Sequence, residues 1–461
     1  MTRIRRWLRR LLLAVAALLA VTVMLVGLSR LTTPTAAQRD VLALMERDEL
    51  PDGPDAYGIL YTQGRDVPYD EIETVLAADA ATVAGWPESW EVDTWEPGRK
   101  VEDYVEWRLD DYPSLSPSRE DSALFCQRFD ETSCLAQVRA APDATAAALA
   151  RNEGLLARAG WLRDAEVVRN AMPHIYAPWP GSPAPGALPL MTVHALAFVQ
   201  GDERYAISET CRDLVTWRRL ATNTDMLTTA IDGIVIAGDG YARLLADMTS
   251  EWPVDRPLPA ACEAALVPPD AEELLMCNVL RGEFQISRRL HADNQKLITL
   301  HGGWLDRVTA KLLYDDQATV AELAALHAPY CRTKRPGRLN HDRPEPGLGA
   351  LLRWSCMGNL GGCAMAALSS ADAYDDYADR MRDFGARLRL LGALAWMREQ
   401  AAESGVTADT LVDRLPAELT DAEQRIALAP DGRALRVALF FDTRGEWAEV
   451  PLPAALVPKQ R

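Results

Sequence analysis

The chain has 461 residues, of which 48% are hydrophobic and 25% charged, and its net charge at pH 7 is −17. This composition is typical of a globular protein and argues against a disordered one. The excess of acidic residues argues against nucleic-acid binding, because an acidic surface repels phosphates.

The N-terminus combines a basic segment with an apolar run. Five arginines lie within residues 1–10, and residues 11–28 read LLLAVAALLAVTVMLVGL, with no charge and Thr22 as the single polar side chain. Eighteen helical residues extend about 27 Å, close to the roughly 30 Å of a bilayer's hydrocarbon core. We therefore predict a cytoplasmic basic tail at 1–10 and a transmembrane helix at 11–29.

A cleaved signal peptide is the alternative interpretation of this run. The small residues Thr35, Ala36 and Ala37 form a possible cleavage site. The apolar region of a cleaved signal is usually only about 7–15 residues long, so the length favours a retained signal-anchor.

The charge distribution predicts the orientation of the chain. Residues 1–30 hold six of the 49 basic residues and none of the 66 acidic ones, so the remainder has a net charge near −23. The positive-inside rule keeps the N-terminus cytoplasmic and exports the rest. The sequence lacks an Asn-x-Ser/Thr sequon, which favours a bacterial periplasm and hence an inner-membrane protein. We expect so acidic a domain to avoid anionic lipid, leaving residues 11–28 as the membrane attachment.

All the cysteines lie beyond the apolar run. An even number of them on the exported side predicts structural disulfides. Short-range bonds are feasible for Cys126–Cys134, if the chain turns between them, and for Cys356–Cys363, where glycines interrupt a helix. Cys262–Cys277 and Cys211–Cys331 are the remaining pairs we expect. The candidate disulfide cysteines are Cys126, Cys134, Cys211, Cys262, Cys277, Cys331, Cys356 and Cys363.

Residues 30–415 are predicted to form a mainly α-helical periplasmic domain. Apolar residues recur with helical spacing along most of it, for example at 69–84, 160–171, 203–221 and 370–402. Proline- and glycine-rich stretches near 173–189, 253–269 and 332–349 mark possible internal joints. Residues 351–367 predict a buried helix pair around a glycine break rather than a second membrane span, since they include Arg353 and Asn359.

The pattern changes period near the C-terminus. Residues 426–441 predict two short strands around the turn Pro430-Asp431-Gly432, and residues 445–450 a third. We therefore expect a small β subdomain at 416–461, so the fold class is mainly α with a β hairpin or three-stranded tail.

An acidic and aromatic stretch at 86–112 is the sharpest candidate for ligand binding. Tryptophans beside carboxylates suit a sugar, because rings stack on the pyranose and acids accept bonds from hydroxyls. The opposing interpretation is that the tryptophans fix an irregular loop onto the helical body, since Trp buries a large area. The candidate residues are Trp86, Trp90, Trp95, Trp107, Glu88 and Glu91.

No short motif of a common catalytic machinery occurs, including P-loop, HExxH, GxSxG and EF-hand sequences. We assign no catalytic residue, cofactor or metal. The leading hypothesis is a non-catalytic interaction or assembly factor with protein partners in the periplasm. The alternative is a periplasmic cell-wall glycan hydrolase or glycan-binding protein that uses residues 86–112.

Overall fold

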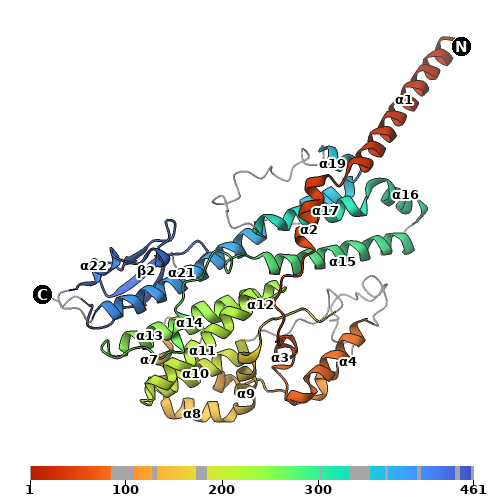
Figure 1. The fold of residues 1–461 in the computed structure, drawn as a ribbon. Coiled ribbons are helices and arrows are strands. Elements are labelled where there is room, and N and C mark those ends of the chain that lie inside the picture. The colour runs from red at the N-terminus through yellow and green to blue at the C-terminus, as the bar shows by residue number, and fades with distance from the viewer. Residues whose placement is uncertain are drawn as a thin grey trace. The chain divides into compact units, whose positions relative to one another are not determined.

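The computed structural model describes residues 2–84, 107–126, 132–172, 184–301, 303–331, 353–368, 372–401, 406–441 and 447–457. The fold is mainly α-helical, with a long apolar N-terminal helix and a three-stranded sheet near the C-terminus, which confirms the predicted fold class (Figure 1). The chain divides into two compact units. Unit 1 consists mainly of residues 1–48 and 280–375, and unit 2 mainly of residues 49–279 and 376–461.

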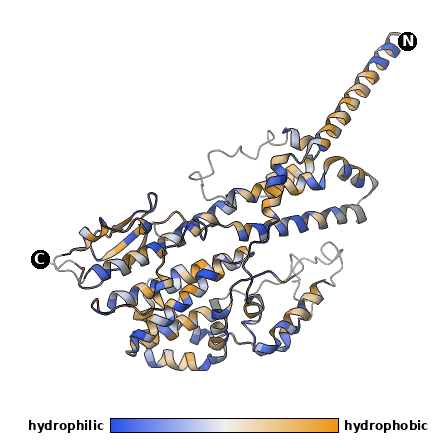
Figure 2. Ribbon diagram, in the orientation of Figure 1, coloured by the Kyte–Doolittle hydropathy of each residue, from blue (hydrophilic) through white to orange (hydrophobic). Residues whose placement is uncertain are grey.

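The N-terminal helix α1 (Thr2–Thr32) contains the predicted apolar run. Residues Ile4–Thr32 are long and apolar enough to cross a membrane, and the most apolar stretch is not buried by any other part of the described chain. Figure 2 shows hydrophobic residues along most of this helix and hydrophilic ones near its start. The helix is thus compatible with a membrane anchor or a signal sequence.

Unit 1 is built around helix α17, which packs against α2 and α20. Its Ala318, Ala321 and Ala324 are buried and so allow close approach of the neighbouring helices. Gly362 of α20 lies so close to α17 that a Cβ atom there would be 2.0 Å from the Thr319 hydroxyl oxygen. The helices of unit 1 are α1, α2 (Ala36–Met45), α15 (Cys277–His301, from residue 280), α16 (Trp304–Leu313), α17 (Asp316–His327), η6 (Ala328–Cys331), α19 (Trp354–Met357), α20 (Leu360–Leu368) and the start of α21 (Asp372–Gln400).

Unit 2 is built around helix α11 (Glu203–Thr222), which packs against α10, α12, α14 and η5. The α11 residues Ile207, Leu214 and Leu220 are fully buried. Its other helices are α3 (Tyr57–Thr62), η1 (Tyr69–Glu71), α4 (Ile72–Ala84), η3 (Arg108–Asp111), α6 (Arg119–Ser122), α7 (Cys134–Ala140), α8 (Pro142–Arg151), α9 (Glu153–Trp161), η4 (Leu162–Asp164), α10 (Ala184–Val199), α12 (Leu227–Val235), η5 (Ile236–Ala242), α13 (Arg243–Glu251), α14 (Cys262–Ala265), the rest of α21, α22 (Ala408–Val412) and η8 (Ala417–Leu419).

One helical expectation in unit 2 is wrong. A helix was expected over 160–171, but η4 ends at Asp164 and the chain continues extended. Val167 forms a parallel bridge with Asp55, and Val168 forms one with Thr224. In contrast, the helix expected over 203–221 is present as α11, and the helical chain after it contains the π-helical turn η5. Tertiary backbone pairing therefore overrides the local helical pattern at 165–168.

The C-terminal strands form one antiparallel sheet in the order β1 (Ile426–Leu428), β2 (Ala434–Ala438), β3 (Trp447–Pro451). Ile426 pairs with Val437, and Leu435 pairs with Val450. Gly432 adopts a positive φ of 69° in the turn between β1 and β2, a conformation that glycine adopts without a steric penalty.

The disulfide pairs are partly those expected. Cys126 is bonded to Cys134 and Cys356 to Cys363, the two short-range pairs predicted from the chain's turns. The expected pairs Cys211–Cys331 and Cys262–Cys277 are wrong, because Cys211 is bonded to Cys262 with a Cα–Cα distance of 5.0 Å. This bond joins α11 to α14, two helices whose adjacency is a tertiary feature. Cys277 and Cys331 are also disulfide-bonded.

Candidate functional site

The end of α1 is hydrogen-bonded into unit 1. Ser29 is fully buried; its hydroxyl donates to the Trp354 carbonyl over 2.8 Å and accepts from the Gly358 N–H over 3.1 Å. The Thr32 hydroxyl oxygen accepts from the Trp354 indole N–H at 3.0 Å. The end of helix α1 is therefore hydrogen-bonded to Trp354 in α19 and to Gly358, which follows α19.

Arg30 connects the end of α1 to two other segments. Its Nε donates to the Gly358 carbonyl at 2.9 Å. Its Nη2 donates to the carbonyls of Lys311, Leu312 and Tyr314 at 2.8, 3.0 and 3.0 Å. The last carbonyls of a helix have no partner within the helix and carry partial negative charge. The guanidinium thus caps the C-terminus of α16.

Beside this connection lies a cavity of about 1290 Å³ formed by α2, α15, α16 and α17, all in unit 1. Aliphatic residues such as Leu42, Val308 and Val320 form part of its wall. Four cationic side chains and two carboxylates also line it: Arg39, Arg288, Arg307, Lys311, Glu46 and Asp316. The charge at the wall is therefore positive, in contrast to the acidic chain as a whole.

An ion pair neutralises part of this charge. Arg288 Nη1 lies 2.9 Å from Glu46 Oε1. The buried ring of His291 also faces the cavity, with Nε2 3.4 Å from Asp316 Oδ1. Burial lowers the pKa of His291, and the Asp316 carboxylate offsets this only in part. His291 is consequently neutral at pH 7, and the positive charge belongs to the arginines and Lys311.

This arrangement can receive an anionic group with an apolar portion. Arginine presents fixed N–H donors to phosphate or carboxylate oxygens, and lysine provides a point charge. The sequence does not predict this cavity, because its walls come from segments separated by about 240 to 280 positions in the chain. The one signal in the sequence is the basic pair Arg307 and Lys311, four positions apart.

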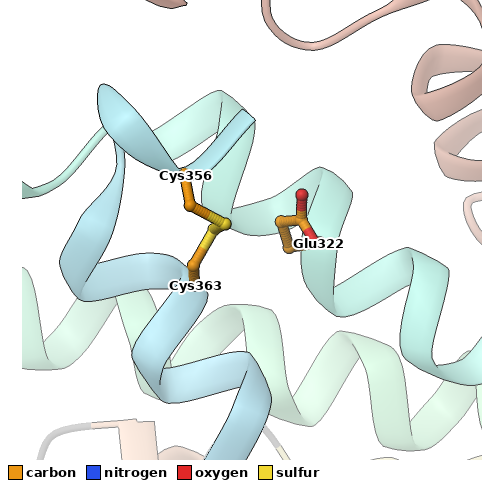
Figure 3. Close-up of side chains that lie close together, drawn as sticks. All are labelled: Glu322, Cys356 and Cys363. Atoms are coloured by element: carbon orange, nitrogen blue, oxygen red, sulfur yellow. A yellow bond between two sulfur atoms is a disulfide. The ribbon is translucent and has the colours of Figure 1, made fainter. Parts of the chain in front are cut away.

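A carboxylate and two cysteine sulfurs also gather in unit 1, where Glu322 faces Cys356 and Cys363 (Figure 3). The sulfurs are joined in a disulfide and so are not thiolate metal ligands. The Glu322 Oε1 atom accepts from Gln38 Nε2 at 2.9 Å, and Oε2 lies 3.4 Å from Arg353 Nη2. The group therefore serves to connect α2, α17 and α19.

Unit 2 contains a buried charge cluster that has the residue types of a catalytic site. His194 Nε2 lies 2.6 Å from Asp213 Oδ2, and Arg163 Nε lies 2.6 Å from Asp213 Oδ1. Burial acts to raise the pKa of Asp213, but His194 and Arg163 outweigh it and lower the pKa. Glu209 completes the cluster at 2.5 Å from Arg163. Both Asp213 oxygens have protein partners, and His194 and Asp213 are both buried, so the cluster connects α10, α11 and η4.

The structure describes one of the six predicted ligand-binding residues. Trp86, Trp90, Trp95, Glu88 and Glu91 lie outside the described residues, as does the joint expected at 332–349. Trp107 is described and is buried, with 8% of its surface exposed.

Comparison with known proteins gives no relationship: no protein-family model, no curated protein and no solved structure matches the chain.

Proposed function

We propose that the protein is a single-pass inner-membrane protein with a retained anchor, whose disulfide-bonded helical domain faces the periplasm as a non-catalytic interaction or assembly factor. Residues 1–10 form the cytoplasmic tail, 11–29 the membrane span, 30–415 the helical domain and 416–461 the β-containing subdomain. The arginines before the span support this orientation, because positive residues remain cytoplasmic. The disulfides support an oxidising compartment for the rest.

The observation that carries the proposal is the capping of α16 by Arg30. Signal cleavage after Ala37 would remove Arg30 and Ser29 and leave their partners in unit 1 without them. It would also destroy the capping box of α2, in which Thr35 and Gln38 exchange hydrogen bonds. A disposable signal peptide has no reason to complete the fold of the mature domain, whereas a retained anchor does.

The role as a binding factor rests on the cavity beside the anchor. Its wall offers cationic and apolar contacts in a chain that is otherwise acidic. Such a site recognises a charged partner. The glycan alternative depends on residues 86–112, most of which lie outside the described part of the chain, so it remains a prediction.

A topology reporter tests the orientation. A phosphatase that is active only in the periplasm, fused after Arg461, is expected to be active in a stable fusion. A reporter that is active only in the cytoplasm serves as the matched control at the same position. Activity of the cytoplasmic reporter and silence of the periplasmic one would overturn the proposal.

Crosslinking in the periplasm followed by purification tests the role. Reproducible protein adducts are expected for an interaction factor. Release of glycan fragments from cell wall by the purified full chain would overturn the non-catalytic assignment.

A further inference from the structure

Helix α16 presents a strongly exposed apolar face. Trp304, Leu305, Val308 and Leu312 are 70%, 59%, 45% and 57% exposed. Their spacing of one, four and eight residues places them on one side of a helix. A contiguous apolar face that is exposed to solvent indicates a site that contacts another protein or a membrane.

The position of α16 is fixed relative to the predicted membrane span. Arg30 bonds to the carbonyls of Lys311, Leu312 and Tyr314, and it follows the last residue of the apolar run, Leu28, by two positions. Two helical residues correspond to about 3 Å along the axis of α1. The C-terminal end of α16 is therefore held at the level where the hydrocarbon-spanning part of α1 ends.

The side chains around this level are those of a membrane interface. Trp354 is 40% exposed and is bonded to Thr32 of α1, and Leu31 is 86% exposed. Tryptophan is enriched where lipid headgroups meet the hydrocarbon. Arg307 and Lys311 lie one turn apart beside the apolar face of α16, where long basic side chains reach phosphates while their stems stay in apolar surroundings.

We infer that α16 lies in the periplasmic surface of the bilayer that α1 spans. Its apolar face enters the lipid, and Arg307 and Lys311 contact phospholipid phosphates. This inference rests on the proposed membrane span and adds a second membrane contact, where the sequence predicted α1 alone. The acidity of the whole chain does not oppose it, because the cavity wall that α16 shares carries four cations against two carboxylates.

Photocrosslinking of the full chain in native membranes tests the inference. The variant Leu305→p-benzoylphenylalanine is illuminated, and the adduct is identified by mass. The matched exposed control is Val267→p-benzoylphenylalanine in unit 2, where the native side chain is 54% exposed. The positive control is Val21→p-benzoylphenylalanine within α1.

The expected result is a mass increase equal to one phospholipid at positions 305 and 21 and none at 267. Lipid adducts at 21 but not at 305 would overturn the inference and leave the membrane span standing. A protein adduct at 305, from a second copy or another partner, would also overturn it. Absence of lipid adducts at 21 would contradict the proposed function and the inference together.

Discussion

The Nη2 atom of Arg30 lies 2.8 Å from the carbonyl oxygen of Lys311, 281 positions further along the chain. Arg30 also donates to Leu312, Tyr314 and Gly358. The Arg30 side chain, near the end of α1, therefore caps the C-terminus of α16 and binds Gly358 after α19. Helix α1 and the rest of unit 1 are therefore bonded together, and this relationship makes specific predictions.

Replacement of Arg30 by alanine is expected to destabilise unit 1. Hydrogen bonds from a charged donor contribute about 1.5–3 kcal/mol each in favourable settings, and Arg30 is partly exposed, so we expect a loss of about 2–3 kcal/mol in total. Arg30→Lys keeps the charge but not the fork of donors and should be intermediate. The measurement is denaturant unfolding in detergent, with Arg425→Ala, at an exposed site, as control. Equal stability of Arg30→Ala and the control would contradict the role of Arg30.

Gly358 is required for the close approach of α1. A Cβ atom at this position would lie 2.7 Å from Arg30 Cγ and 3.2 Å from the Ser29 hydroxyl oxygen. We expect Gly358→Ala to lower the free energy of unfolding by about 1–3 kcal/mol, as overpacking does. In contrast, a Cβ at Gly160 in α9 meets nothing within 4 Å. Gly160→Ala is thus expected to be neutral or stabilising in the same assay. The same response from both variants would refute the steric argument.

Removal of the Cys211–Cys262 bond is expected to destabilise the protein more than removal of Cys126–Cys134. The bonds span 51 and 8 positions, and the chain-entropy argument gives about 4 and about 2.5 kcal/mol. The double variants Cys211→Ala/Cys262→Ala and Cys126→Ala/Cys134→Ala are compared by unfolding. Peptide mapping without reduction checks the pairing directly. A peptide joining Cys211 to Cys331 would show that the described pairing is wrong.

Asp247 in α13 is expected to make unit 2 less stable as the pH rises through about 6. Burial raises the pKa of Asp247 to about 6, and Glu251 acts in the same direction. The folded state then binds the proton more tightly than the unfolded state, whose carboxyl titrates near 3.9. Stability is therefore lost between about pH 4 and pH 6 and is lowest above that range. Asp247→Asn should stabilise the protein by about 2 kcal/mol at pH 8 and much less at pH 4.

Thermal unfolding at the two pH values provides this measurement. Asp413→Asn, at an exposed position, serves as the control and is expected to have a similar small effect at both. A larger gain for Asp247→Asn in acid than at pH 8 would reverse the predicted sign and exclude the burial explanation.

Local features of the fold could be predicted from the sequence, whereas contacts between distant segments could not. The apolar run, the C-terminal turn at Gly432 and the Cys356–Cys363 bond each depend on residues close in sequence. The Cys211–Cys262 pairing depends on how α11 packs, and the extended chain at Val167 and Val168 depends on partners about 55 to 110 positions away. Because these partners are distant in sequence, no local pattern of residues predicts them.

The candidate cavity shows the same division. The sequence places Arg30 two positions after the apolar run. It did not indicate that Arg30 bonds to the Lys311 carbonyl, since contacts across hundreds of residues leave no periodic signal. The sequence predicted a glycan site at 86–112 instead, because this stretch is rich in tryptophans and acidic residues.

The proposal of a retained anchor is tested most directly by the mass of the protein purified from membranes. The proposal predicts an uncut chain of about 50.8 kDa that yields peptides containing Ser29 and Arg30. A mature protein that begins at Gln38, with residues 1–37 removed, would contradict it.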